Sequence, residues 1–331
     1  MTPLRRFPRL ARLRDRWSRA AVVMYHRIAT TDRDPWGLAV SPEHFAEHLA
    51  QYRRRRTLLT MNAFVDCLCR DRLPRDAIAI TFDDGYVDNL VYALPILKDA
   101  DVPATLFLTS GPTLRREFYW DAEIEAMILD AVDPVDVCVM LPDGPLHIQF
   151  DERWPADAAR AGWRAWTASR TPREAAFVQS WRRLRSLLPR DRKRAMCQLR
   201  RVLQTGPSPE IRPLTVPEVR RLVSSEHVTL GGHTVDHPDL PALDDPDALD
   251  EIARGKADVE AILCRPITGF AYPFGRLDAR IRTWAEAAGY EWACTTEPSF
   301  VGAAGVNKLA IPRLTARDSG DTSFLDAGNG V

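Results

Sequence analysis

The sequence predicts an α/β fold in which parallel strands alternate with helices. Short apolar, β-prone runs recur along the chain, amphipathic stretches lie between them, and the polar motifs follow the ends of the runs. Alternation of this kind is typical of a doubly wound sheet or a β/α barrel, and both place polar sites at the carboxyl ends of their strands. The predicted strands cover 21–25, 77–82, 103–109, 228–232, 268–272 and 290–295.

Helix-start signals separate these runs. Ser41 followed by Pro42 indicates an N-cap with proline in the first turn, and Phe45, Leu49 and Tyr52 then follow at helical spacing. A capping box is predicted where Thr215 precedes Glu218. Two further helices are expected, at 244–263 and 278–288.

The alternation stops between residues 112 and 214. This stretch is rich in tryptophan and arginine, and its second half, 173–203, has a helical pattern. We therefore expect a helical insertion at 112–214 within a single α/β unit that extends over 21–318. The Gly-, Ser- and Asp-rich residues 319–331 are expected to form a flexible tail.

Composition is ordinary for a soluble globular protein, with a formal net charge of 0 over 331 residues. A neutral chain gives no general electrostatic reason to bind nucleic acid. The six cysteines have no metal-binding spacing and indicate small buried side chains in a reducing compartment. No apolar run reaches 18 residues, so no membrane span is predicted. A cytoplasmic location is expected.

Residues 1–20 carry seven arginines and no apolar signal core. Phe7, Leu10, Leu13 and Trp17 fall on one face of a possible helix whose other face is basic. Two interpretations stay open. This segment is either a membrane-surface helix, which would give the protein peripheral membrane contact, or an arm lying against the domain.

Two short motifs carry the functional prediction. Thr81-Phe82-Asp83-Asp84-Gly85 closes one predicted strand, and His233-Thr234-Val235-Asp236-His237 follows another. Alone, an Asp-Asp-Gly is most often a turn, and a His pair four residues apart is often structural. Together at two strand ends, Asp84, His233 and His237 make a three-ligand set for a divalent cation such as zinc. Asp83 is left over as a base.

A cation with three protein ligands keeps an open position for water. It polarises a carbonyl group and lowers the pKa of water from about 15.7 toward roughly 7. This combination predicts metal-assisted hydrolysis. Thr234 or Asp236 is expected to orient a ligand imidazole through a hydrogen bond.

These two motifs resemble those of the polysaccharide deacetylase family (NodB homology, carbohydrate esterase family 4). The resemblance extends from about Val22 to Arg313 and is interrupted by the insertion. It implies a distorted (β/α)7 barrel, a TIM-like fold, with a divalent metal that is usually zinc. It also places the family's catalytic base on Asp83 and its metal ligands on Asp84, His233 and His237.

A third motif is similar to Gly269–Gly275, which contains Tyr272-Pro273-Phe274. The resemblance implies that the backbone N–H of Phe274 helps to hold the oxyanion, and Tyr272 is assigned to substrate binding. This chain departs from the family at Ala271, where an arginine usually contacts the base. Arg313 is the candidate substitute, and a salt-bridging surface arginine is the alternative.

The family's late histidine, which acts as general acid, is absent because no histidine follows His237. His26 lies at the end of the first predicted strand. Members that act on exopolysaccharides also open with a Tyr-His pair, which implies that His26 can protonate the leaving amine. A structural, hydrogen-bonding role at the edge of the core is the alternative. Trp120 and Asp121 are candidates for contact with a sugar ring, although packing within the insertion would explain the tryptophan equally.

The predicted function is hydrolysis of a C–N bond other than a peptide bond. The expected substrate is an N-acetylated amino sugar in a polysaccharide, an oligosaccharide or a lipid-linked precursor. Two alternatives stay open. One is amide or imide hydrolysis of a small molecule, and the other is a non-catalytic carbohydrate-binding protein that retains the fold.

Overall fold

A curved parallel sheet forms the centre of the computed structural model, which describes residues 19–151, 153, 162–203, 206–302, 306–322 and 325. Its strand order is β11–β10–β9–β6–β5–β1–β12, and β4 pairs with β5 off this path. The strands are β1 (Ala21–Tyr25), β4 (Thr57–Leu58), β5 (Ala77–Phe82), β6 (Ala104–Leu108), β9 (Val228–Gly232), β10 (Gly269–Ala271), β11 (Trp292–Cys294) and β12 (Leu314–Thr315).

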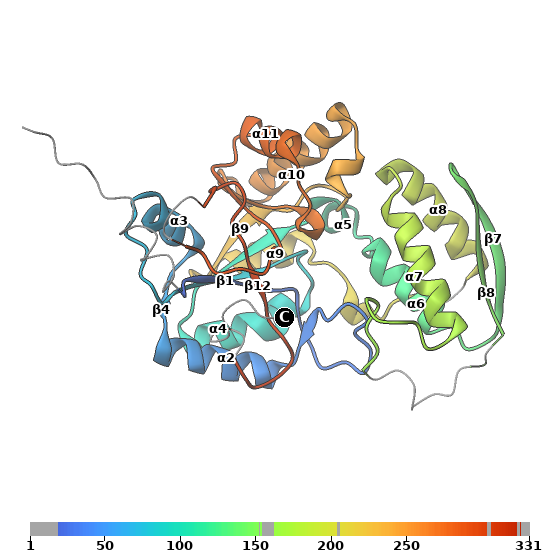
Figure 1. Cartoon of the computed structure of the whole chain (residues 1–331), viewed down its shortest axis with the longest axis horizontal. Coiled ribbons are helices and arrows are strands. Elements are labelled where there is room, and N and C mark those ends of the chain that lie inside the picture. The colour runs from blue at the N-terminus through green and yellow to red at the C-terminus, as the bar shows by residue number, and fades with distance from the viewer. Residues whose placement is uncertain are drawn as a thin grey trace, which may run out of the picture.

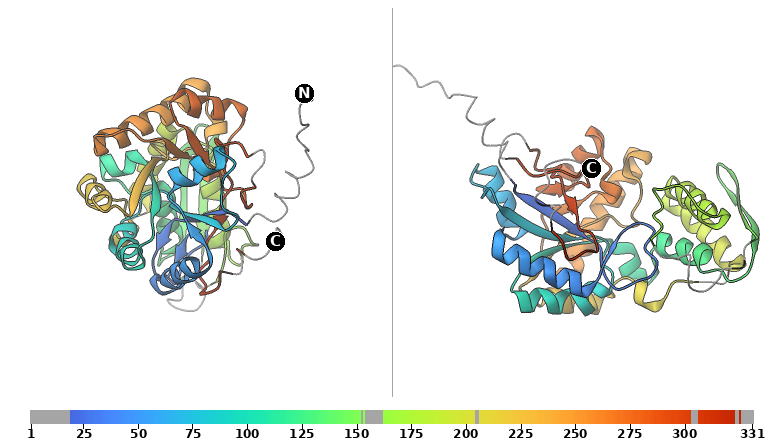
Figure 2. Two further views of the ribbon diagram at one scale, coloured as in Figure 1. Left: turned by 90° about the vertical axis from the view of Figure 1, so that its left-hand side faces the viewer. Right: turned by 60° about the horizontal axis from the view of Figure 1, so that its bottom comes forward.

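The two ends of this sheet approach each other, so that it curls as a barrel does (Figure 2). On one side Leu314 of β12 pairs with Val23 of β1. On the other, Ile311 forms an isolated parallel bridge with Cys294 of β11. The six predicted strands are present, whereas β12 was not predicted because two residues carry no readable pattern.

Helices cover the outer face of the sheet. Side chains alternate along β5, so that Ile78, Ile80 and Phe82 pack against these helices while Ala77 and Ala79 face the interior. The predicted caps at Ser41 and Thr215 are present. The helices on this face are α2 (Pro42–Arg55), α4 (Leu94–Ala100), α9 (Val216–Val223), α10 (Asp245–Leu263) and α11 (Ala279–Ala287), whereas α3 (Met61–Cys69) packs with the inward-facing alanines of β5.

The insertion stands beside the barrel with a hydrophobic core of its own (Figure 1). Its elements, after α5 (Ser110–Arg115), are α6 (Trp120–Leu129), β7 (Val135–Leu141), β8 (Gly144–Phe150), α7 (Pro172–Arg185) and α8 (Pro189–Val202). The expectation of a helical insertion was therefore incomplete. The antiparallel β7–β8 hairpin alternates buried and exposed residues, and this period-two signal was overlooked among the tryptophans and arginines.

Shorter elements complete the chain: β2 (Arg27–Ile28), β3 (Ala39–Val40), a π-helical turn at Asn89–Ala93, and 3₁₀ turns at Pro209–Ile211, Leu240–Ala242 and Pro273–Gly275. The amphipathic pattern predicted for residues 1–20 lies outside the described residues, except for Arg19 and Ala20. In the described part of the chain, no helix has both the length and the apolar character that a membrane crossing requires.

The expectation of a flexible tail was wrong for residues 319–322. The carbonyl oxygen of Ser319 lies 2.6 Å from His48 Nε2, and that of Gly320 accepts a hydrogen bond from Gln51 at 2.7 Å. Thr322 donates to the same glutamine. These contacts attach the start of the tail to α2, because the polar side chains of that helix satisfy the backbone groups of the tail.

Candidate active site

The two aspartates of the first motif leave the end of β5 in different directions. Asp83 continues the inward-facing set of the strand, and Asp84 turns away with a left-handed backbone, φ 71°. Gly85 follows at φ 97°, and a Cβ at this position would lie 2.4 Å from Leu108 Cδ1. Only glycine fits this turn, and the turn gives the adjacent carboxylates separate roles.

Asp84, His233 and His237 come together as a possible metal site. Asp84 Oδ1 lies 3.5 Å from His233 Nε2 and 3.6 Å from His237 Nε2, and the candidate ligand atoms all lie within 4.8 Å of one another. His233 Nδ1 lies 2.7 Å from the carbonyl oxygen of Ala271, to which it donates. That bond leaves the Nε2 lone pair for a cation, so the donor set fits a divalent metal.

The loop that carries both histidines is held from α10. The Glu251 carboxylate accepts hydrogen bonds from the backbone N–H groups of Val235 at 3.0 Å and Asp236 at 2.8 Å. Gly255, one turn further along α10, lets this helix approach the loop closely, since a Cβ there would lie 2.7 Å from the carbonyl carbon of Thr234. The expectation that Thr234 or Asp236 orients an imidazole was wrong, because Ala271 does so.

Four residues around the site have a left-handed backbone that non-glycine residues rarely adopt. Asp84, Thr234, His237 and Phe274 have φ values of 71°, 65°, 50° and 57°. Each such residue costs on the order of 1–3 kcal/mol and persists only where the surrounding structure imposes it. Their concentration around one set of ligands marks this region as a functional site.

Arg313 binds Asp83 in a bidentate ion pair. Both terminal nitrogens of Arg313 donate to the carboxylate, at 2.7 Å each, and Nε donates to the carbonyl oxygen of Thr295 at 2.8 Å. The arginine is 0% exposed, so the alternative of a surface salt bridge is wrong. Burial opposes ionisation of Asp83, but the guanidinium outweighs it and holds the pKa of the carboxyl below its ordinary value.

His26 lies beside the same carboxylate. Its Nε2 lies 4.0 Å from Asp83 Oδ2, and 15% of its side chain is exposed. The general-acid candidate therefore sits beside the base candidate and is open to solvent. Desolvation of the partly buried His237 lowers its pKa to about 3, which keeps the imidazole neutral, the form that binds a metal.

The third motif brings Phe274 to the site and keeps Tyr272 away from it. The Phe274 ring lies 4.5 Å from that of His237, on a turn that begins at Pro273. Tyr272 is 0% exposed, and its hydroxyl donates to the carbonyl oxygen of Leu309 at 3.0 Å. Its assignment to substrate binding was wrong, because alternation along β10 places this ring among the helices.

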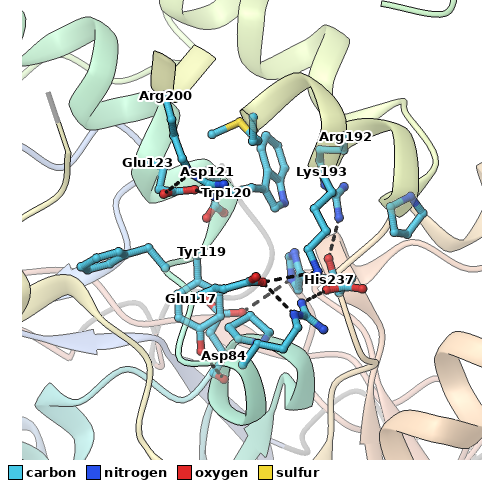
Figure 3. Close-up of a pocket in the computed structure, with 16 residues that line it drawn as sticks. Asp84, Glu117, Tyr119, Trp120, Asp121, Glu123, Arg192, Lys193, Arg200 and His237 are labelled. Carbon is cyan, nitrogen blue, oxygen red and sulfur yellow. Dashed lines mark hydrogen bonds and ion pairs between the residues drawn. The ribbon is translucent and has the colours of Figure 1, made fainter. Parts of the chain in front are cut away.

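The candidate site opens into a pocket between the barrel and the insertion (Figure 3). Asp84 and His237 form its floor, and residues of α6 and α8 form its walls. Trp120 and Asp121, predicted to contact substrate, both line it. The Trp120 ring packs against Trp181 and under the guanidinium of Arg192, at 6.0 and 4.7 Å between centres. The Trp120 ring therefore packs within the insertion, as the alternative interpretation of this residue predicted.

Sequence reasoning missed three contributors to this site: the Ala271 carbonyl, Glu251 and Arg192. A carbonyl group carries no residue-type signal. Glu251 looks like an ordinary polar position of an amphipathic helix, and Arg192 is one of many arginines in the insertion. Only the fold brings them to the motif residues.

Comparisons with known proteins agree with this geometry. Residues 70–132 and 198–293 match the family model for polysaccharide deacetylase. The protein YxkH of Bacillus subtilis (strain 168), which is named after the same family, is 33% identical over 90 residues. That alignment covers 26% of this chain and 30% of the relative's length. The family resemblance predicted from the motifs is confirmed.

Solved structures show the same fold at low sequence identity. The deacetylase PplD of Streptococcus pyogenes, in complex with acetate, has a TM-score of 0.57 and 18% identity over 90% of this chain and 92% of its own. IcaB from Ammonifex degensii has a TM-score of 0.56 and 16% identity over 92% of this chain and 93% of its own. A de-N-acetylase from Aggregatibacter actinomycetemcomitans has a TM-score of 0.57 and 12% identity over 93% of this chain and 98% of its own. The predicted barrel fold class is confirmed.

Proposed function

Because the chain carries a polysaccharide deacetylase domain, we propose that it is a metal-dependent hydrolase that releases acetate from an N-acetylated amino sugar. One observation carries the proposal. Asp83 is buried and ion-paired to Arg313, and it stands beside, but outside, the cluster of Asp84, His233 and His237. A base next to a three-ligand metal site can activate water for the hydrolysis of an unactivated amide.

The roles of the side chains follow from their positions. A divalent cation, zinc in this proposal, would supply Lewis-acid polarisation of the acetyl carbonyl. Asp83 takes the proton of the attacking water, and Arg313 keeps this carboxylate ionised and correctly oriented. His26, 4.0 Å from Asp83, returns a proton to the leaving amine. The backbone N–H of Phe274 donates to the developing oxyanion.

Acetate release from a panel of acetylated glycans tests this proposal. We expect release by the wild-type protein, loss on chelation and recovery on adding zinc. Asp83→Asn removes the proton acceptor and should lower turnover by about 10²- to 10⁴-fold while retaining bound metal. Asp136→Asn, at an exposed position of β7, is the matched control. Undiminished release by Asp83→Asn would exclude the proposed base.

Amide or imide hydrolysis of a small molecule remains the second candidate. The observation that favours it is the pocket itself, because α6 and α8 stand over the ligand cluster where a long polymer would have to pass. The same assay separates the two functions. Release confined to cyclic amides or imides, with none from acetylated sugars, would establish this second function.

We propose in addition that the protein touches anionic membranes. A second pocket is lined by Arg19, Arg55, Arg56 and Arg75, and Arg19 directly follows the arginine-rich residues 1–18 in the sequence. Clustered arginines attract phosphate headgroups with about 1 kcal/mol each. Sedimentation with phosphatidylserine vesicles should retain the protein at low salt. Binding to neutral phosphatidylcholine vesicles of equal strength would contradict the electrostatic explanation.

A further inference from the structure

The pocket over the ligand cluster contains donor groups that the proposed chemistry does not use. Arg192 is 3% exposed, and its Nη1 has no hydrogen-bond partner. The indole Nε1 of Trp120 is also buried without a partner. Two buried, unsatisfied donors on one pocket wall are unusual, since such groups are nearly always satisfied and each costs about 1–3 kcal/mol when it is not.

These donors are fixed in place above the ligand cluster. Arg192 Nη2 donates to the carbonyl oxygen of Asp236 at 2.5 Å, next to His237, and the guanidinium stacks on the Trp120 ring. Figure 3 shows Trp120 and Arg192 on the side of the pocket that faces Asp84 and His237. Packing therefore holds both donors in position before any ligand arrives.

An acceptor lies beside the two donors. Asp121 lines the same pocket, and its one hydrogen bond in the described part of the chain is from the backbone N–H of Ala122 to Oδ1, at 2.9 Å. Its Oδ2 is therefore available to a ligand hydroxyl. Neighbouring carboxylates differ in this respect, because each is ion-paired to a cation of α8. Glu117, which precedes α6, pairs with Lys193 at 3.5 Å, and Glu123 of α6 pairs with Arg200 at 2.5 Å.

The charges around Arg192 indicate the kind of ligand. Asp121, Asp236 and Glu251 surround this guanidinium and act on it electrostatically. An additional anion would lie close to these three acidic side chains, and the cations Lys193 and Arg200 of the same pocket are already ion-paired to Glu117 and Glu123. The unused Nη1 donor therefore suits a neutral oxygen, as a sugar hydroxyl provides, better than a phosphate or a carboxylate.

Resting on the proposed deacetylase function, we propose that Trp120, Asp121 and Arg192 form a subsite for the hydroxyl groups of a neutral amino sugar. Asp121 accepts from one hydroxyl, while Trp120 Nε1 and Arg192 Nη1 donate to its neighbours. The subsite holds the sugar ring whose acetamido group faces the ligand cluster. The insertion thereby selects uncharged N-acetylhexosamine units over sulfated or carboxylated ones.

Steady-state kinetics with the N-acetylglucosamine trimer and its 6-O-sulfated counterpart test the subsite. The wild-type protein should have the higher kcat/KM for the neutral trimer. Trp120→Phe keeps the ring and removes one neutral donor, so KM should rise about three- to tenfold with kcat nearly unchanged. Arg192→Lys keeps the positive charge but removes the planar set of guanidinium N–H donors, so KM should rise at least about tenfold.

Two controls and one direct measurement make the result decisive. Trp166→Phe and Arg194→Lys change exposed residues of the insertion and should leave KM unchanged. Calorimetric titration of the trimer into Asp83→Asn, with and without Trp120→Phe, measures binding without turnover. Unchanged KM in both subsite variants, or a preference for the sulfated trimer, would overturn the subsite.

Failure of the subsite and failure of the proposed function give different results. If the wild-type protein releases acetate from the trimer and the variants behave as wild type, only the subsite is wrong. If no acetylated sugar is hydrolysed, the proposed function is wrong. A trimer that is neither hydrolysed by the wild type nor bound by Asp83→Asn overturns the subsite as well.

Discussion

Arg313 and Asp83, 230 positions apart, share two hydrogen bonds of 2.7 Å inside the barrel. Neither side chain has appreciable contact with solvent. The arginine precedes β12, the strand that closes the sheet against β1, so the same segment completes the barrel and pairs with the proposed base. A position far outside the family motifs thus fixes the orientation of the Asp83 carboxylate.

Replacement of Arg313 tests this dependence. Arg313→Met leaves a buried carboxylate without its partner, and we expect unfolding to cost about 3–5 kcal/mol less than in the wild type. Urea denaturation measures the change. The double variant Asp83→Asn/Arg313→Met should regain most of the lost stability and remain inactive. A single variant as stable as the wild type would show that the ion pair contributes nothing to folding.

His26 should influence turnover and leave metal binding intact. His26→Ala removes the proposed proton donor to the leaving amine, and turnover should fall by about 10²- to 10⁴-fold. Metal content, measured by atomic emission, should stay at one ion per chain. His147→Ala, at an exposed position of the hairpin, serves as the matched control. Full activity of His26→Ala would exclude it from the mechanism.

Metal removal should lower thermal stability, since a ligand that binds only the folded state stabilises that state. Zinc at 100 times its Kd adds about 2.7 kcal/mol, which thermal denaturation detects readily. His237→Ala removes one of three ligands and should abolish both the zinc-dependent rise in Tm and the stoichiometric ion. An equal response of the variant and the wild type to zinc would place the cation elsewhere.

Glu251 should act on the metal site through the loop it holds. Glu251→Ala leaves the N–H groups of Val235 and Asp236 without their acceptor, and zinc affinity should fall about 10- to 100-fold. Glu251→Gln keeps an acceptor oxygen and should retain most of the affinity. Competition with a fluorescent chelator measures both. Similar losses in the two variants would show that the negative charge is what matters.

Asp121 should make the metal-free protein less stable as pH rises. Burial, with a contribution from Asp84, raises the pKa of Asp121 to about 7, above its unfolded value of about 3.9. The stability that the protonated carboxyl contributes is thus present below pH 4 and lost as pH rises toward 7. Asp121→Asn should flatten this decline. Parallel pH–stability curves for variant and wild type would contradict the assignment.

An element of this fold is predictable from sequence when its residue pattern is long enough to be recognised. Strands β1, β5 and β9 begin and end where predicted, because each is an apolar run with polar residues after it. The β7–β8 hairpin carried an alternating pattern that was read as helical. Strand β12 has two residues, and its position depends on pairing with β1 rather than on its own side chains.

The residues of the candidate site also fall into two groups, those in recognisable local motifs and those that only the fold brings to the site. Residues with distinctive chemistry in fixed motifs, such as Asp83 and His233, were identified from sequence. Arg313 could be named only as one candidate, since nothing local indicates that its partner lies 230 residues away. Tyr272 was misassigned because a motif fixes a backbone turn but does not determine which way each neighbouring side chain points.

The left-handed backbones of Asp84, Thr234, His237 and Phe274 imply a trade-off between activity and folding stability. Glycine would relax the chain locally at each position, but at Asp84 or His237 it would remove a candidate ligand, and at Thr234 or Phe274 it would remove a side chain that contacts His237. Laboratory evolution that selects only for thermostability would therefore favour substitutions at these positions. The most stable variants would then be inactive.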